Sequence, residues 1–122
     1  MITQEFLSQC SEEQINKGVA WVESKEGVKA FSQRRDQLLK FTSLSVSYGL
    51  ASNFNPCANP NDIMPIAFAN GIAIMPDSDG SWKSGRLPSN PEMTFGWSNF
   101  VRGYKNPLRA ICEVYILMSF NK

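Results

Sequence analysis

Residues 106–120 read NPLRAICEVYILMSF, and this stretch decides the fold. Asn106 is a favourable N-cap residue, and Pro107 suits the first helical position because its missing N–H has no partner to lose there. The run from Leu108 to Phe120 is mostly apolar. A helix of that composition is mostly buried, so we expect it at the centre of the domain. The residues expected to form its one polar stripe are Arg102, Lys105, Arg109 and Glu113.

The segment before this helix predicts a β-hairpin. Residues 72–75 are expected to form a short buried strand, residues 77–80 (DSDG) a turn, and residues 81–84 (SWKS) the returning strand. Residues 85–105 are rich in Gly, Pro, Asn and aromatic side chains, and we expect a strand around 94–97 within them.

A further helix is predicted just ahead of the hairpin, and two starts compete for it. Asn59-Pro60 offers an N-cap and a first helical residue, but Pro65 would then lie inside the helix, where its ring clashes with a preceding carbonyl. A cap at Asp62 places Pro65 in the first turn instead. We therefore favour a helix over 63–70, capped by Asp62 and closed by Gly71.

The N-terminal part of the chain predicts one clear helix. Ser11 and Gln14 resemble a capping box, and Ile15, Val19 and Val22 follow at helical spacing. This pattern indicates an amphipathic helix with one face in the core.

Two segments after that helix are less regular. Residues 28–39 fit either a short strand or a charged helix, and the alternation over 44–48 predicts a half-buried strand. Together the elements predict a small α+β protein in which about three helices pack on a small antiparallel sheet. We expect a single domain over residues 1–122.

Composition excludes several classes of protein. The chain has 122 residues, of which 43% are hydrophobic and 19% charged, and its formal net charge is +1. A charge so near zero is not typical of a protein that binds nucleic acid or a membrane surface. The chain contains no histidine, which rules out Ser-His and Cys-His catalysis and histidine metal sites within it.

Cysteine usage and the N-terminus predict an intracellular protein. Cys10, Cys57 and Cys112 are far apart and form no C-x-x-C pair, so reduced thiols are expected. The N-terminus lacks a basic region followed by an apolar run, and no apolar segment approaches the roughly 20 residues of a membrane span.

Two blocks of sequence carry a family resemblance. They are residues 54–66, FNPCANPNDIMPI, and residues 106–118, NPLRAICEVYILM. Together they resemble the NinX family of lambdoid phages, small proteins with a domain of unknown function, and residues 13–20 are similar to that family's opening helix. The resemblance implies a phage or prophage origin and a location in the cytoplasm of the bacterial host. It supplies no activity and no catalytic residues.

Cys57 is the candidate reactive thiol, and it has two interpretations. It precedes a predicted helix start, where backbone N–H groups and the helix dipole lower the pKa of a thiol. The alternative is a small buried apolar residue that pins the neighbouring Asn-Pro turns, and we favour this packing role. No histidine is available to act as its base.

Asp77 and Asp79 resemble a fragment of a calcium loop, but Pro88 stands where a bidentate glutamate is needed. A hairpin turn explains both carboxylates. We therefore expect no metal and no cofactor.

An aromatic and basic segment provides the candidate partner-binding surface. Trp, Tyr and Arg are enriched at protein–protein hot spots, and the same residue types bind single-stranded nucleic acid by stacking and phosphate contact. The plainer alternative is a solvated face with core aromatics. The candidate residues are Trp82, Lys83, Arg86, Phe95, Trp97, Phe100, Arg102, Tyr104 and Lys105.

The leading interpretation is a non-catalytic phage accessory protein that binds a host or phage protein and so modulates host functions or defence. The second is a nucleic-acid-binding factor in phage recombination or replication. The third is a small thiol enzyme that uses Cys57. The sequence leaves the oligomeric state open.

Overall fold

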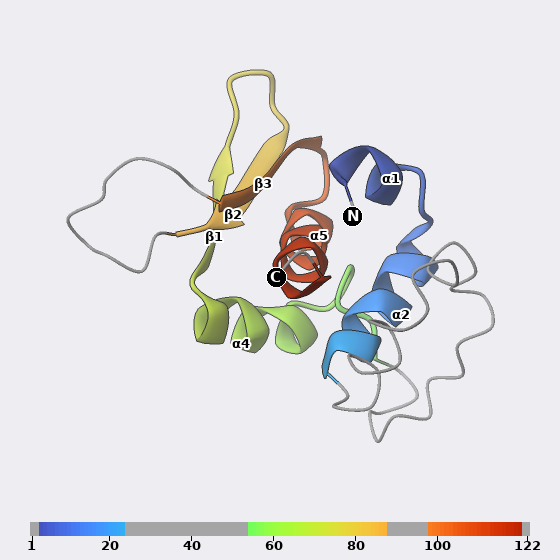
Figure 1. Cartoon of the computed structure of the whole chain (residues 1–122). Coiled ribbons are helices and arrows are strands. Elements are labelled where there is room, and N and C mark those ends of the chain that lie inside the picture. The colour runs from blue at the N-terminus through green and yellow to red at the C-terminus, as the bar shows by residue number, and fades with distance from the viewer. Residues whose placement is uncertain (1–2, 24–53, 88–97, 121–122) are drawn as a thin grey trace.

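The computed structural model describes residues 3–23, 54–87 and 98–120 (Figure 1). The predictions for residues 28–39, 44–48 and 94–97 lie outside these ranges. Within them the chain forms four helices and a three-stranded antiparallel sheet, which confirms the α+β class. The helices are α1 (Gln4–Ser8), α2 (Glu12–Glu23), α4 (Pro60–Asn70) and α5 (Pro107–Phe120), and the strands are β1 (Ile72–Pro76), β2 (Trp82–Arg86) and β3 (Ser98–Tyr104).

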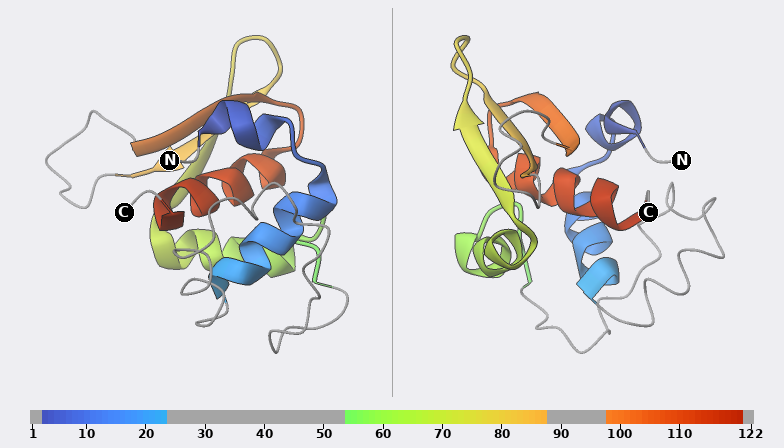
Figure 2. Two further views of the ribbon diagram at one scale, coloured as in Figure 1. Left: turned by 45° about the vertical axis from the view of Figure 1, so that its right-hand side comes forward. Right: turned by 60° about the vertical axis from the view of Figure 1, so that its left-hand side comes forward.

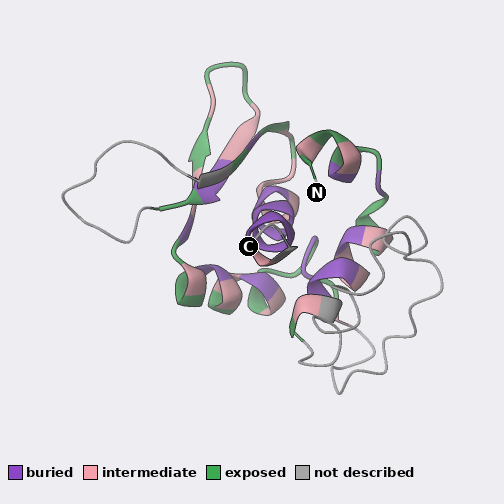
Figure 3. Cartoon of the chain, in the orientation of Figure 1, coloured by how far each residue is buried: buried purple, intermediate pink, exposed green. Residues whose placement is uncertain are grey.

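Helix α5 is the centre of the described fold, as its sequence predicts. It contacts every other described helix and strand, and all residues from 110 to 118 are buried. Figure 1 shows α5 between the sheet on one side and α2 and α4 on the others, and Figure 3 shows it buried along most of its length. Burying this helix on all sides removes its apolar surface from water, which is the main favourable term in folding.

The N-terminus of α5 is capped as predicted. Asn106 Oδ1 accepts a hydrogen bond from the Leu108 N–H at 3.0 Å, and Asn106 Nδ2 donates to the Cys57 carbonyl at 2.7 Å. The same side chain therefore caps the helix and ties it to the turn before α4. The predicted polar stripe is wrong in part, because Arg102 lies on β3 and Lys105 precedes the cap, which leaves Arg109 and Glu113 as its charged members.

The predicted hairpin is confirmed by β1 and β2. The expectation that its first strand is buried is wrong, because only Ile72 of β1 is buried and Met75 is exposed on the side away from α5. Asp77 and Ser81 close the turn with a backbone hydrogen bond of 2.8 Å, and Gly80 adopts a φ of 84° that few other residues tolerate. The third strand, β3, pairs with β2 and completes the strand order β1-β2-β3. One row of cross-strand partners faces α5 and the core, and it consists of Ile74, Ser84 and Val101.

A β-bulge at Gly103 changes which side chains of β3 face the core. Arg102 pairs with Lys83 and Tyr104 pairs with Trp82, so Gly103 is an extra residue between the two pairs. Its φ is 87°, in the left-handed region where glycine is favoured. The bulge turns Tyr104 toward α5 while Arg102 stays on the opposite side of the sheet.

The predicted start of α4 is wrong. The helix begins at Pro60 with Asn59 as its N-cap, whose Oδ1 accepts from the Asn61 N–H at 3.0 Å. Pro65 lies inside the helix but is exposed, and so is Asn61, whose carbonyl loses its helical N–H partner to the proline. Asp62 instead accepts a hydrogen bond from the Asn55 N–H at 2.8 Å in the preceding turn.

The predicted end of α4 is confirmed. Gly71 terminates the helix with a φ of 66°, and its N–H bonds the Ala67 carbonyl. Ile63 and Ala67 are buried, and Ile66 packs partly against the core.

The capping box of α2 is confirmed in both directions. The Ser11 N–H donates to Gln14 Oε1 at 2.8 Å, and the Gln14 N–H donates to Ser11 Oγ at 3.2 Å. Ile15 and Val19 are fully buried on the face toward α5. Helix α1, which the sequence analysis did not predict, precedes this box and buries Leu7.

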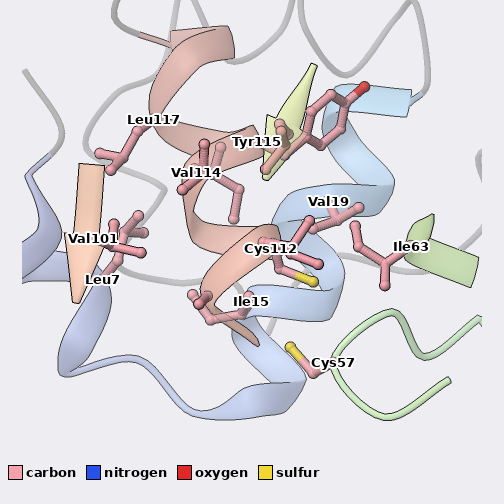
Figure 4. Close-up of a cluster of buried hydrophobic side chains, with 14 of the residues drawn as sticks. Leu7, Ile15, Val19, Cys57, Ile63, Val101, Cys112, Val114, Tyr115 and Leu117 are labelled. Carbon is pink, nitrogen blue, oxygen red and sulfur yellow. The ribbon is translucent and has the colours of Figure 1, made fainter. Parts of the chain in front are cut away.

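The core is a single cluster of side chains drawn from all these elements. Figure 4 shows side chains of α1, α2, α4, α5 and β3 converging around α5, with two cysteine sulfurs among them. A compact domain usually has one contiguous core of this kind.

Candidate functional site

The sheet divides the predicted partner-binding surface into two sides. Successive side chains of a strand point to opposite faces, so Lys83 and Arg102, which pair across β2 and β3, lie opposite the core. Met75 pairs with Lys83 from the other side and extends the same row onto β1. We call Met75, Lys83, Phe100 and Arg102 the outer face of the sheet. Figure 2 shows α5 along one face of the sheet and no described helix on the other.

The outer face combines apolar and cationic side chains. Met75 is 43% exposed and Phe100 is 40% exposed, although both are large hydrophobic residues. Lys83 is half-buried and Arg102 is exposed. A mixed patch of this kind, on a face that no described helix covers, is suited to contact with another molecule.

An ion pair fixes Arg102 on this face. Its guanidinium donates to Asp77 Oδ2 at 2.9 Å, and this bond joins β3 to the hairpin turn. The Ser78 N–H bonds Asp77 Oδ1 and lowers the pKa of this carboxyl, and Arg102 and Lys83 lower it further. Asp77 is therefore held as an anion between two cations.

The remaining predicted residues are dispersed. Trp82 is half-buried, and Tyr104 points toward α5, so neither belongs to the outer face. Arg86 is exposed at the end of β2, and Lys105 is exposed in the connection between β3 and α5. Phe95 and Trp97 lie outside the described residues.

Tyr104 belongs to a buried polar network around Glu113. The Glu113 carboxylate, which is fully buried, accepts hydrogen bonds from the Tyr104 hydroxyl and from Arg109 Nε, the latter at 3.0 Å. The Arg109 guanidinium also donates to the carbonyls of Leu7 and Cys10, beside α1. The network joins α1, β3 and α5, and every buried side-chain nitrogen and oxygen among the described residues has a partner.

The electrostatics of this network follow from burial. Burial raises the pKa of Glu113, even though hydrogen bonds from Tyr104 and Arg109 both lower it. Burial and the Glu113 carboxylate raise the pKa of Tyr104 well above its usual value. The group is enclosed and fully paired, so its geometry supports a structural role rather than contact with a substrate.

Cys57 is packed in the core. Its side chain is fully buried, its N–H donates to Asn16 Oδ1 at 2.9 Å, and its carbonyl accepts from Asn106. Figure 4 shows its sulfur among the core side chains, together with that of Cys112. Burial raises the pKa of Cys112 well above the usual value, and the neighbouring Cys57 thiol raises it further. This environment favours the packing role of Cys57 over the reactive one.

The carboxylates of the hairpin turn are occupied by local bonds. Asp79 accepts from the Ser81 N–H at 3.0 Å and from the Ser81 hydroxyl, while Asp77 holds Arg102. Among the described residues, no group of three or more His, Cys, Asp or Glu side chains is arranged to hold a metal ion. Within the same part of the chain, no helix has both the length and the hydropathy that crossing a bilayer requires.

Sequence reasoning missed Met75 and the ion pair of Asp77 with Arg102. The hairpin register carries a signal for Met75, because the turn at 77–80 places it near Lys83 on the returning strand. No local signal exists for the ion pair, whose two residues are 25 positions apart.

Fold and surface define a small α+β protein with a partly cationic sheet face that no described helix covers. The family model described as Bacteriophage P22, NinX matches residues 7–119. The chain therefore belongs to this phage family, as residues 54–66 and 106–118 predict. No curated protein and no solved structure matches it.

Proposed function

We propose that this NinX-family chain is a non-catalytic phage accessory protein that binds a host or phage protein in the bacterial cytoplasm. The observation that carries the proposal is the outer face of the sheet, where Met75 and Phe100 are exposed beside Lys83 and Arg102. Arginine and large apolar side chains together are typical of the residues that contribute most binding energy at protein interfaces.

The chemistry of the described residues supports binding rather than catalysis. The buried carboxylate Glu113 is fully paired, and Cys57 is buried. In the hairpin turn, Asp79 is exposed but accepts from Ser81, and Asp77 is held by Arg102. None of these groups combines exposure with a neighbouring acid or base, which general acid–base or nucleophilic catalysis requires.

Capture of partners from a host-cell lysate tests the proposal. The variant Phe100→Ala with Arg102→Ala should lose most of the captured protein, because it removes one apolar and one cationic contact from the outer face. The matched control, Phe68→Ala with Lys105→Ala, removes the same kinds of side chain elsewhere, since Phe68 is 76% exposed on α4. Thermal unfolding should show both variants folded. Unchanged capture by the first variant, or equal loss by the control, would rule out this face.

Nucleic-acid binding is the second candidate, carried by the exposed cations Arg86, Arg102 and Lys105 on or near β2 and β3. The affinity of such binding falls steeply as the salt concentration rises. The reason is that the Lys and Arg side chains displace counterions condensed on the nucleic acid, and this release is less favourable at high salt. Titration of labelled single- and double-stranded DNA at low salt decides it, and no binding at micromolar protein would end it.

A further inference from the structure

We infer that the outer face of the sheet binds an acidic segment of a partner protein, one in which an Asp or Glu lies between apolar side chains. The inference rests on the proposed function, because it specifies the chemistry of the partner at the same face. It follows from the placement of charge, from cross-strand geometry and from the apolar neighbours.

On this face the Arg102 cation is exposed to solvent, whereas the Asp77 anion is mostly shielded from it. In the ion pair of Arg102 with Asp77, the Arg102 side chain is 65% exposed and the Asp77 side chain only 10%. The carboxylate is turned into the hairpin, where it also accepts from the Ser78 N–H. A guanidinium has five N–H donors, so Arg102 retains donors for a second carboxylate.

The cross-strand register places two cations side by side. Lys83 and Arg102 are directly paired on neighbouring strands, where Cβ atoms lie about 5 Å apart and like charges destabilise the sheet. Asp77 offsets part of this repulsion, and its pKa is lowered by both cations. The exposed Asp79 carboxylate in the hairpin turn also interacts with Arg102. A carboxylate from a partner can bond the Arg102 donors that Asp77 leaves unused.

Apolar side chains flank the cations on the same face. Met75 continues the row from Lys83 onto β1, and Phe100 lies two residues from Arg102 on β3. Neighbouring strands are about 4.8 Å apart, so the row from Met75 to Arg102 spans about 10 Å. In an extended segment the residues at i and i+2 lie on one side about 6.6 Å apart, so a segment with an acidic residue at i and an apolar residue at i+2 matches the spacing of Arg102 and Phe100 along β3.

A phosphate backbone fits this face less well. Double-stranded DNA carries one charge per about 1.7 Å, and tight binding usually engages several phosphates. The outer face offers two cations, and Asp77 already neutralises part of their charge. The apolar residues Met75 and Phe100 then contribute to a protein contact.

Fluorescence anisotropy with designed peptides tests the inference. The probes are a labelled peptide in which leucine and glutamate take turns at every second position with serine between them, the same peptide with glutamine in place of glutamate, and a labelled single-stranded oligothymidine. We expect the glutamate peptide to bind at least about tenfold more tightly than the glutamine peptide. Equal affinity for the two peptides, or tighter binding of the oligothymidine, overturns the inference.

Charge variants of the folded protein locate the effect. Lys83→Glu with Arg102→Glu should abolish binding of the glutamate peptide, whereas Lys105→Glu, which reverses an exposed charge outside the outer face, should change it by less than about threefold. Asp77→Asn should tighten binding, because it removes the anion that competes for Arg102. Weaker or unchanged binding by a folded Asp77→Asn protein contradicts the inference.

The peptide and capture experiments separate this inference from the proposed function. If capture depends on Phe100 and Arg102 but the glutamate peptide shows no preference, the outer face binds a protein of other chemistry and only the inference fails. If capture does not depend on the face, the proposed function fails as well.

Discussion

Glu113 is the central carboxylate of a buried polar network in the interior of the described fold. It is fully buried, and its two oxygens accept from Tyr104 and Arg109. Arg109 in turn bonds the carbonyls of Leu7 and Cys10, so one buried carboxylate positions the group that holds α1. Removing one partner of a buried pair leaves the other charge without compensation.

We therefore expect Glu113→Gln to lower the free energy of unfolding by about 3–5 kcal/mol, because the amide NH2 cannot accept in place of one carboxylate oxygen and the neutral side chain leaves the Arg109 charge unpaired. Urea denaturation followed by circular dichroism measures it. The control is the triple variant Tyr104→Phe, Arg109→Met and Glu113→Leu, which removes the whole network and should regain much of the loss. A Glu113→Gln protein as stable as the parent would contradict this account.

Two tyrosines make the fold sensitive to alkali. Burial raises the pKa of Tyr115, and its hydrogen bond to Glu23 raises it further; burial and Glu113 do the same for Tyr104. A pKa that is raised by folding means that the native state holds the proton more tightly than the unfolded state. This stability is fully present below the ordinary tyrosine pKa of about 10 and is lost as the pH rises above it.

The free energy of unfolding should accordingly fall above about pH 10, by at most about 1.4 kcal/mol per pH unit for each of these tyrosines. Denaturation at a series of pH values measures the slope. Tyr115→Phe should be less stable at neutral pH but show a shallower alkaline slope. An identical slope in the two proteins would show that Tyr115 does not contribute.

At the scale of the element, α4 shows how a helix start is chosen. The start at Pro60 places Pro65 inside the helix, which costs a hydrogen bond, but Pro65 faces solvent. Beginning there lets the Asn59 side chain bond the Asn61 N–H and keeps Ile63 and Ala67 directed at the core. The Asn59 cap favours the start at Pro60, and Asp62, the competing cap, is engaged by the Asn55 N–H instead.

Asn59→Ala should therefore destabilise the protein by about 1 kcal/mol, the usual value of an N-cap side chain. Chemical denaturation measures the change. Asn61→Ala is the matched control, because Asn61 is exposed in the first turn and the cap bond uses only its backbone N–H. Equal effects of the two substitutions would mean that Asn59 is not the cap.

At the scale of the whole molecule, α5 connects all the other described helices and strands. It contacts α1, α2, α4 and all three strands, so loss of its packing weakens every one of these contacts. Cys57 is enclosed by the same packing and reaches solvent only when the structure opens. The accessibility of this thiol is thus a measure of the stability of the fold.

We expect slow alkylation of Cys57 at neutral pH, with a rate that follows unfolding. Ile116→Ala should lower the free energy of unfolding by about 2–5 kcal/mol and speed the alkylation by at least about tenfold. Mass spectrometry of the labelled peptides measures the rate, and Glu13→Gln on the exposed side of α2 is the control. Rapid alkylation of the parent protein would instead support the reactive thiol.

The sequence by itself determined the elements whose signals are local. The caps at Asn106 and Ser11, the hairpin turn and the glycine end of α4 each depend on residues within a few positions of one another, and all are confirmed. The apolar composition of α5 likewise identified the centre of the fold, because a helix with so little polar surface is stable only when it is buried.

Only the tertiary structure decided what depends on distant partners. In α4 the Asp62 carboxylate bonds the Asn55 N–H in the preceding turn and leaves the cap to Asn59. The bulge at Gly103 sends Tyr104 inward to Glu113, while Arg102 stays on the outer face beside Asp77. Short-range propensity carries no information on such pairings, because their energy exists only after the chain has brought the partners together. For that reason Lys83, Phe100 and Arg102 of the outer face could be predicted from the sequence. Only the sheet register shows that they share one side of the sheet with Met75.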